Sequence, residues 1–350
     1  MDHVTTFQLP RSEQRESPLF NGKIPGEIRD RILAFTLSCY NSPKAWDKDS
    51  SYVRPEYSAY LVADTSILQT CQRAYAENWF RPWMSAVHTF YLAWPGRRPK
   101  EPNTTPGFQR VLDRLFTAHG EVEIPHVRVF AQLCALEDGC ELLSQILNLT
   151  YFFPHRLTVT IRHHDWYGWE EDDRLHIGAY WVDTCRFPAT LHEICLELES
   201  LQRKRNQIEC IADQMIEKWP FVRKDGMTMS ARKEECKEDL WSGSSTWQGR
   251  RWLRDETKPG INEYFVKAIT WKPNRGRAER LEPENLSVPD SFHAIISNEP
   301  SVSVRRLNRA QVPKDLAADE TLRRLHEWER DDPGVSNSSD EDADSFRRLG

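Results

Sequence analysis

The pattern of hydrophobic and polar positions divides the chain into five segments. Apolar residues recur at helical spacing near the N-terminus, and runs of β-branched and aromatic residues in the middle are typical of strands. Both ends are polar and carry no such period. The pattern predicts a flexible leader (1–19), a helical segment (20–82), an α+β body (83–273), a weakly structured extension (274–330) and an acidic disordered tail (331–350).

The helical segment contains two predicted helices. Pro25 suits the first turn of a helix, because that position needs no backbone N–H, and Ile28 and Ile32 follow at helical spacing. A second helix is expected over residues 65–79, and Pro82 prevents it from continuing. The two helices would form an N-terminal helical hairpin.

The body alternates predicted strands with predicted helices. Its strands are expected over residues 86–94, 156–164 and 264–271, with a fourth over 127–130. Helical patterns lie over 108–118 and 133–149. We expect an α+β fold in which a mainly antiparallel sheet packs against one long helix.

That long helix is predicted over Thr190–Trp219. Thr190 and Glu193 have the spacing of a capping box, and Pro220 follows the last residue. Apolar residues alternate in steps of three and four along most of it: Ile194, Leu198, Leu201, Ile208, Ala212, Met215 and Trp219. Such a stripe fits a coiled-coil dimer or a helix that packs across a sheet. Because Arg205 interrupts the stripe, we favour packing across the sheet.

Charge limits the classes of partner. The chain has 47 Lys and Arg against 53 Asp and Glu, a net charge of −6; its last twenty residues carry six acids and two arginines, or −4, which leaves −2 for the rest. A near-neutral body offers no basic face for nucleic acid. No apolar run approaches the ~18–20 residues of a membrane helix, and the first thirty residues lack a signal-peptide pattern. Neither a membrane protein nor a secreted protein is expected.

The cysteines and tryptophans favour an intracellular globular protein, cytoplasmic or nuclear. Thirteen Trp residues argue for a well-packed body, since disordered chains are poor in aromatic residues. None of the eight cysteines forms a C-x-x-C pair or stands near a histidine at zinc-finger spacing. We therefore expect buried structural thiols, and neither a metal nor a cofactor.

Two segments at the N-terminus resemble the opening of F-box proteins. They are Ile24–Ile32 (IPGEIRDRI) and Leu68–Glu77 (LQTCQRAYAE). The F-box is a short helical module that docks on the adaptor subunit of cullin-type ubiquitin ligases, while the rest of such a chain holds a protein substrate. The loop from Cys39 to Ala63 is longer than an F-box normally has between these helices, so a hairpin that only caps its own domain stays an alternative.

The resemblance implies a partner-binding face on the predicted hairpin. An exposed apolar face on a helix can enter a groove of a partner protein. The residues that would form or support this face are Pro25, Ile28, Ile32, Leu68 and Tyr75.

Two further segments resemble a recurrent pattern in a group of filamentous-fungal proteins to which no activity is assigned. They are Thr158–Glu170 (TVTIRHHDWYGWE) and Trp241–Trp252 (WSGSSTWQGRRW). Members of this group often begin with the same F-box-like pattern, and the resemblance covers roughly residues 20–273. It implies a family but no chemistry.

These two Trp-rich segments are also the best candidates for a ligand cleft. Its residues would be His163, Asp165, Trp169, Trp247 and Trp252. A hydrolase-type site that uses His163, His164 or Asp165 is conceivable, but it lacks an identifiable nucleophile or metal-ligand set. Histidines that satisfy hydrogen bonds at a packed strand end are the favoured interpretation.

The sequence therefore predicts a non-catalytic protein-interaction module, with an F-box-like substrate receptor as the leading hypothesis. The alternative is a stand-alone fungal binding or scaffold protein with no ligase role. In the acidic tail, Ser338 and Ser339 each precede an acidic residue by three positions, a pattern that acidophilic kinases favour.

Overall fold

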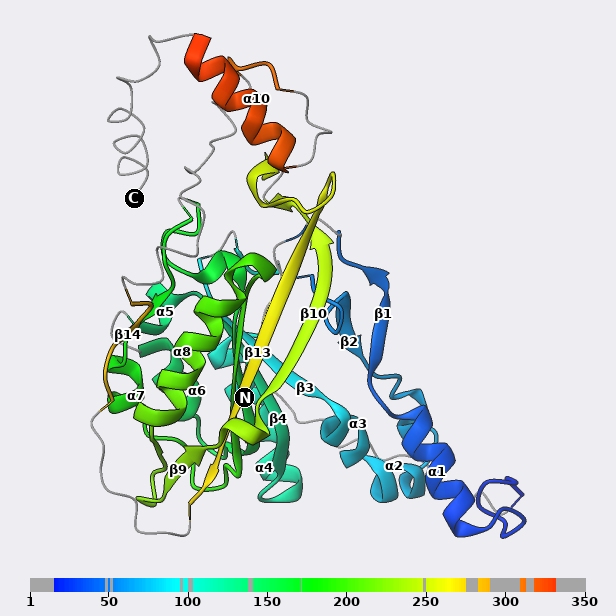
Figure 1. The fold of residues 1–350 in the computed structure, drawn as a ribbon. Helices are drawn as coiled ribbons and strands as arrows, with labels where there is room; N and C mark the ends of the chain where they lie inside the picture. The colour runs from blue at the N-terminus through cyan, green and yellow to red at the C-terminus, as the bar shows by residue number, and fades with distance from the viewer. Residues whose placement is uncertain are drawn as a thin grey trace.

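The computed structural model describes most of the chain between Glu16 and Asp331 (Figure 1). The described residues are 16–47, 50, 53–94, 97–99, 103–137, 141–170, 172–247, 250–274, 283–289, 309–312 and 318–331. Most of the predicted leader and tail, with Ser338 and Ser339, lies outside these residues.

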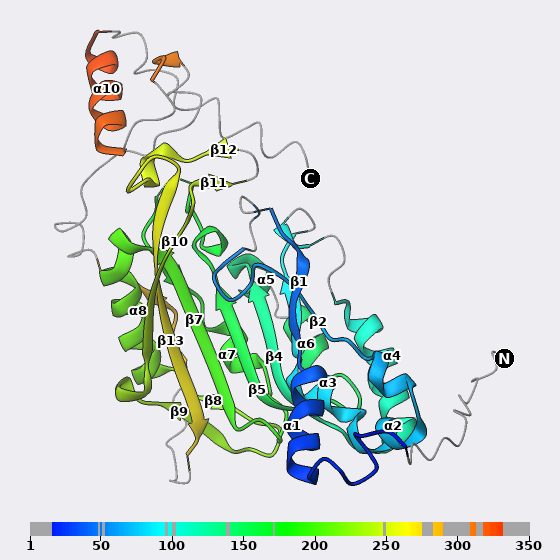
Figure 2. The same cartoon turned by 90° about the vertical axis from the view of Figure 1, so that its right-hand side faces the viewer.

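An eight-stranded mixed sheet forms the centre of the body (Figure 2). The strand order is β3-β4-β5-β7-β13-β9-β8, and β10 also pairs with β13. The pairs among β3, β4, β5 and β7 are parallel, and the other pairs are antiparallel. The strands are β3 (Val87–Leu92), β4 (Glu123–Ala131), β5 (Phe153–Ile161), β7 (Glu193–Leu201), β8 (Phe221–Val222), β9 (Thr228–Ala231), β10 (Lys237–Ser244) and β13 (Ile261–Pro273).

The fold contains both helices and a large sheet, as an α+β protein should, but the sheet is not mainly antiparallel. Helices separate the parallel strands along the chain: α4 (Thr105–His119) follows β3, α5 (Leu133–Glu137) and α6 (Glu141–Leu147) follow β4, and α7 (Tyr180–Thr184) precedes β7. Such helices provide the crossover that parallel neighbours require. The helices predicted at 108–118 and 133–149 lie in these connections, but the sequence analysis did not infer parallel strands from them.

The predicted long helix over Thr190–Trp219 is wrong in its first half. Residues Glu193–Leu201 form strand β7, and the helix α8 covers Arg205–Lys218. In β7, Ile194, Leu196 and Leu198 point to the apolar core, and Cys195, Glu197 and Glu199 alternate with them. This period of two is a strand pattern, and the predicted helical stripe shares only Ile194 and Leu198 with it among the residues of β7.

Helices cover one face of the sheet and enclose the main core. Side chains from α4 to α8 pack on alternate residues of the strands, such as Val129, Val159, Leu196 and Ile269. Figure 1 shows α8 and α7 on one side of β13 and β10, and β1 on the other side. The apolar face of the sheet and the apolar sides of the helices bury each other and so form the core.

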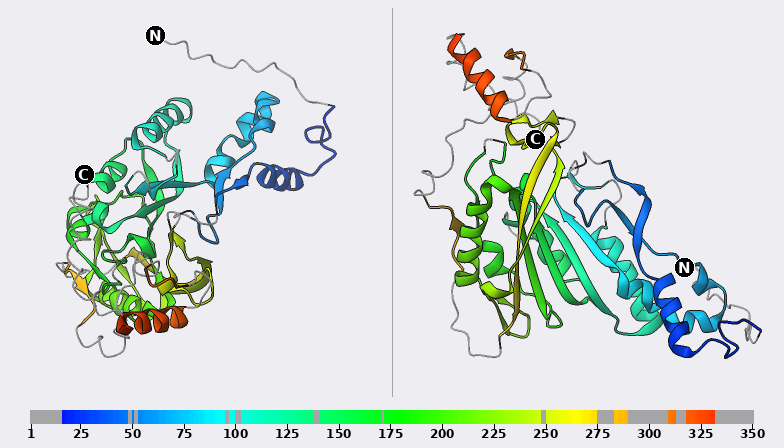
Figure 3. Two further views of the ribbon diagram at one scale, coloured as in Figure 1. Left: turned by 90° about the horizontal axis from the view of Figure 1, so that it is seen from above. Right: turned by 45° about the vertical axis from the view of Figure 1, so that its right-hand side comes forward.

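Residues Gly26–Ser85, here named the N-terminal arm, do not form the predicted two-helix hairpin. Between α1 (Gly26–Thr36) and α2 (Gln72–Asn78) the chain forms an antiparallel β-hairpin, β1 (Tyr40–Ala45) and β2 (Ala59–Val62), and the 3₁₀ helix η1 (Ser66–Gln69). Pro82 lies in the first turn of α3 (Phe80–Ser85), where no backbone N–H is needed. Figure 3 shows α1 at one end of the molecule, away from α8.

Smaller elements complete the structure. They are β6 (His176–Ile177), β11 (Thr246–Trp247), β12 (Arg250–Arg251), β14 (Leu286–Ser287), η3 (His163–Asp165), η4 (Gln202–Lys204), η5 (Lys233–Glu235), η6 (Leu253–Asp255) and α10 (Ala318–Asp331). The predicted extension contributes α10, whose Leu325 packs with Leu253 in a second small core. Among the helices that the structure describes, none has the length and apolar character to cross a bilayer.

Candidate functional site

A cavity of about 470 Å³ lies at the end of the sheet where the parallel strands β5 and β7 finish. Residues Val53–Ser58, here named the strap, connect β1 to β2 and contribute to one wall. The end of β10 and the start of β13 contribute to another wall. The carboxyl ends of parallel strands are a common place for ligand binding. The charged and aromatic side chains that line the cavity are Arg54, Arg162, His164, Glu199, Trp241, Trp247 and Tyr264.

Two glutamates of β7 and an arginine of the strap form an ionic network beside this cavity. Nη1 of Arg54 lies 3.1 Å from Oε2 of Glu197 and 3.8 Å from Oε2 of Glu199. Arg128 of β4 donates to Oε1 of Glu197 at 3.4 Å, and the hydroxyl of Thr160 donates to Oε2 at 2.8 Å. Because Arg54 comes from the strap and both glutamates from the sheet, the network attaches the arm to the body.

The pKa values of the two glutamates shift in opposite directions. Burial acts to raise the pKa of Glu197, but Arg54, Arg128, the hydrogen bond from Thr160 and His126 together outweigh burial and lower the pKa. Burial raises the pKa of Glu199, although Arg54 and the indole N–H of Trp241, 3.2 Å from Oε2, act against that shift. Neighbouring carboxyl groups with separated pKa values occur often at functional sites.

The histidine and tryptophan residues predicted to line a ligand cleft lie against one another. His164 stacks on Trp247 with ring centres 3.8 Å apart. The ring of Trp169 lies 5.7 Å from that of His163 and 4.7 Å from that of Trp252. Of the five residues predicted to form the cleft, only Trp247 lines the cavity; His163, Asp165, Trp169 and Trp252 do not, whereas the neighbouring His164 does. The rings mainly pack the two Trp-rich segments together.

His163, His164 and Asp165 form the 3₁₀ turn η3, because β5 ends at Ile161 and not at residue 164 as the sequence predicted. His163 is buried and His164 is half-buried, and burial, with neighbouring positive charges, holds the pKa values of both imidazoles well below the ordinary range. Nδ1 of His163 lies 3.3 Å from Oγ of Ser200, and Oδ2 of Asp165 accepts from Nε of Arg162 at 2.8 Å. These contacts fix the turn, so they favour the structural interpretation over a hydrolase site.

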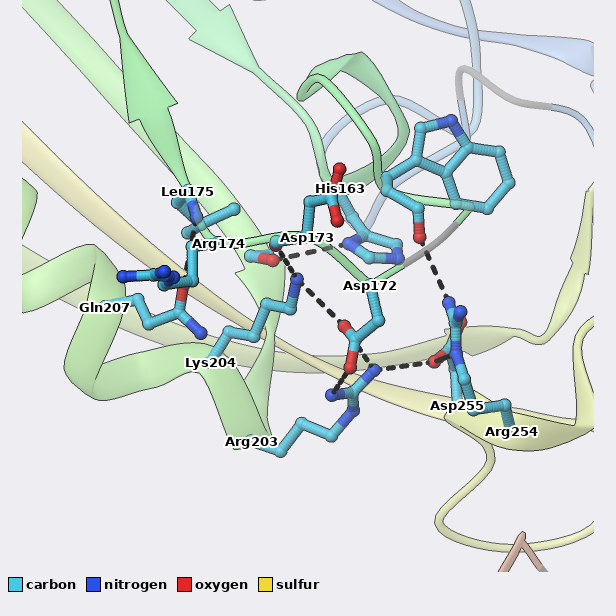
Figure 4. A network of polar contacts seen from close by, with 12 residues as sticks. His163, Asp172, Asp173, Arg174, Leu175, Arg203, Lys204, Gln207, Arg254 and Asp255 are labelled. Atoms are coloured by element: carbon cyan, nitrogen blue, oxygen red, sulfur yellow. Dashed lines mark hydrogen bonds and ion pairs between the residues drawn. The ribbon is translucent and has the colours of Figure 1, made fainter. Parts of the chain in front are cut away.

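A second ionic network supports this turn from the side of α8 (Figure 4). Nζ of the buried Lys204 lies 2.8 Å from Oδ1 of Asp172. Arg203 bridges Asp172 and Asp255, with contacts of 2.6 and 2.8 Å, and Nε of Arg254 lies 2.7 Å from Oδ1 of Asp255. The network links the segment after β5 to η6, and it thereby fixes the two Trp-rich segments relative to each other.

The predicted partner-binding residues divide into exposed and buried ones. Ile28 and Ile32 of α1 are 45% and 39% exposed, Tyr75 of α2 is 42% exposed, and Pro25 precedes the first turn of α1. Leu68 is buried, so it supports the arm from inside. Of the sixteen large apolar side chains exposed among the described residues, nine lie in the arm: Ile28, Ile32, Phe35, Tyr40, Tyr60, Leu61, Tyr75, Phe80 and Met84.

The sequence analysis missed the charged residues of the cavity network. Glu197 and Glu199 were placed on a helix, and Arg54 on an unpatterned loop. The strict alternation of residues 194–199 could have placed both glutamates on one face of a strand. Nothing in the sequence indicates that Arg54 lies beside them, because that contact joins positions 143 residues apart.

A comparison of the chain with protein-family models, curated proteins and solved structures finds no match. Within the residues that the structure describes, no group of three or more His, Cys, Asp or Glu side chains is placed to hold a metal ion.

Proposed function

We propose that this protein is a non-catalytic protein-interaction module whose arm docks on the adaptor subunit of a cullin-type ubiquitin ligase. The body would then hold a protein substrate. The F-box-like segments suggest this partner, and the exposed apolar stripe of α1 is the observation that carries the proposal.

The stripe follows one side of α1. Ile28, Ile32 and Phe35 are spaced by four and three residues, so they share a helix face, and Phe35 is 84% exposed. Leu33 and Leu37 are buried and anchor the other side of the helix. A helix with one face buried in its own protein and a second apolar face exposed is suited to a groove of a partner.

The arm presents α1 on a fixed base. Arg81 of α3 pairs with Asp30 of α1, and Nη2 of Arg29 lies 3.8 Å from Oε2 of Glu77 on α2. Because these pairs hold α1 against α2 and α3, docking would require little ordering of the helix, and preorganisation of this kind favours binding.

The experiment is capture of the purified adaptor subunit by the full chain, measured for the wild type and for Ile32→Asp. We expect the aspartate to abolish capture, because it places a charge in the centre of the apolar stripe. The matched control is Val111→Asp on α4, since Val111 is 41% exposed and lies outside the arm.

The proposal stands if the wild type and Val111→Asp capture the adaptor and Ile32→Asp does not. If the wild type fails to capture it, or if Ile32→Asp captures it equally well, α1 has another role. The alternative of a stand-alone binding or scaffold protein then becomes the better explanation.

A further inference from the structure

The cavity beside the strap has a mixture of chemical groups that adaptor docking through α1 does not explain. Its wall contains guanidinium groups of Arg54 and Arg162, the buried carboxyl of Glu199 and the aromatic rings of Trp241 and Tyr264. A volume of about 470 Å³ falls in the lower part of the range of small-molecule sites. The size therefore fits a small ligand rather than a folded partner.

The charges of the wall are already balanced within the protein. Arg54 faces Glu197 and Glu199, and Arg162 contacts Asp165 at 2.8 Å. An anionic ligand would compete with these carboxylates for the guanidinium groups, and a cationic ligand would meet two arginines. A purely apolar ligand would cover buried ionic groups without giving them hydrogen bonds, which is costly.

A neutral ligand with many hydroxyl groups avoids all three conflicts. Each hydroxyl both donates and accepts, so it can use guanidinium donors and a carboxylate acceptor in the same wall. The indole of Trp241 stacks on Tyr264 with ring centres 4.4 Å apart, which gives the wall a rigid aromatic patch next to those polar groups.

We propose that this cavity is a binding site for a neutral, hydroxyl-rich small ligand of the mono- or disaccharide class. Glu199 and Arg54 would bind the hydroxyl groups, and Trp241 would contact the C–H face of the sugar ring. The site lies between the strap and the body and uses no residue of the α1 stripe, so its test is separate from the test of adaptor docking.

The test is saturation-transfer NMR on the full chain with glucose, mannose, galactose, N-acetylglucosamine, maltose and cellobiose. Choline and inorganic phosphate serve as the charged probes, the latter observed by its ³¹P line width. We expect saturable binding of at least one sugar and of neither charged probe. Ser242→Phe is the blocking variant, because Ser242 is exposed and lines the cavity; it should weaken sugar binding at least about tenfold (about 1.4 kcal/mol).

The matched control is Ser230→Phe, which adds the same ring at an exposed position of β9 and should leave sugar binding unchanged. Glu199→Gln keeps the shape of the side chain and should also weaken binding about tenfold. Circular dichroism of each variant checks that it is folded. The proposal is overturned if no sugar binds saturably, if choline or phosphate binds instead, or if folded Ser242→Phe binds the sugar as the wild type does.

Discussion

The two faces of the central sheet bury different kinds of side chain. On the helix-covered face, β4, β5 and β7 contribute Val129, Val159 and Leu196, which pack against other apolar groups. On the opposite face the neighbouring positions are Arg128, Thr160 and Glu197, and these interact through ion pairs and hydrogen bonds. Alternate residues of the same strands thus form an apolar core on one face and a layer of ion-paired and hydrogen-bonded side chains on the other.

The difference between the two faces bears on how the strap finds its position on the sheet. Apolar packing tolerates many partners of similar volume, whereas a buried charge requires a partner of opposite charge. Arg54 of the strap supplies such a partner for Glu197, and Tyr57 of the strap packs on Phe130 with ring centres 5.1 Å apart. We infer that the ion pairs on the polar face determine where the strap packs, and that the apolar face contributes most of the free energy of folding.

Acidification should have the largest effect on stability, because each face of the sheet holds a half-buried histidine. Burial lowers the pKa of His88 on the helix-covered face and of His126 on the polar face, each to about 4. The unfolded chain therefore binds protons first, so the stability that these groups contribute is complete above about pH 6.5 and is lost as the pH falls towards 4. Each pKa unit is worth about 1.4 kcal/mol, so two histidines together outweigh any single substitution below.

The measurement is the free energy of unfolding from urea titrations at several pH values between 7.5 and 4.5. His88→Leu should flatten the pH dependence, because it removes one of the groups whose pKa differs between the two states. Glu199 acts in the opposite direction, since its raised pKa means that the folded state takes up its proton first. A free energy of unfolding that does not change between pH 7 and pH 5 would contradict the lowered pKa values of His88 and His126.

Trp271→Ala should give the largest effect of a single substitution at neutral pH. Trp271 is fully buried on the helix-covered face, and its indole N–H donates to the backbone oxygen of Trp219 at 2.8 Å. Loss of such a ring from a packed core costs about 3–5 kcal/mol. Leu240→Ala on β10 is the control, because Leu240 is 53% exposed and should change stability by less than about 0.5 kcal/mol.

Glu197→Ala tests the polar face. The substitution leaves Arg54 with Glu199 at 3.8 Å and Arg128 with Glu56 at 3.8 Å, so neither arginine loses every partner. We expect the free energy of unfolding to fall by about 2–3 kcal/mol, which is less than the ~3–5 kcal/mol expected when a buried charge loses every partner. Urea unfolding measures it, and trypsin cleavage within the arm should become faster because the strap is released.

The control for that comparison is Glu238→Ala. Glu238 pairs with Arg205 and Lys267, but its side chain is 40% exposed. An exposed ion pair is worth about 0–1 kcal/mol, so this variant should unfold close to the wild type. If Glu197→Ala and Glu238→Ala lower the free energy of unfolding equally, the burial of Glu197 does not make its ion pairs more stabilising than the exposed ion pairs of Glu238.

The sequence predicted the elements better than their arrangement. Strands β3, β4, β5 and β13 fall on the stretches with β-branched and aromatic residues, because that composition is a local property. Strand direction is not local: it follows from helices that cross between strands, and the sheet is mixed rather than mainly antiparallel. The arm differs for the same reason, since the β1–β2 pairing inside the predicted loop joins two segments with weak patterns.

The candidate site shows the same limit. Aromatic residues such as Trp247 are conspicuous in the sequence, and the structure places this one in the cavity wall. Glu199 has an ordinary type and spacing, and the sequence analysis missed it as a cavity residue because it assigned a helical period to the residues of β7. A pattern can rank residues by chemistry, but burial and pairing depend on the tertiary fold.

Apart from the two control variants, the smallest effects on stability should come from exchanging Val and Thr at adjacent positions of β5. Thr158 and Val159 are both 1% exposed but face opposite sides of the sheet, and Oγ1 of Thr158 lies 2.8 Å from Nε2 of His126. Val159→Thr buries a hydroxyl among apolar groups and should cost about 1–3 kcal/mol, whereas Thr158→Val removes one hydrogen bond and should cost about 1 kcal/mol. The urea unfolding midpoints of the two variants measure the difference. Since the shape of the side chain is almost unchanged in both, a lower cost for Val159→Thr than for Thr158→Val would show that the two faces do not differ in polarity as their residues imply.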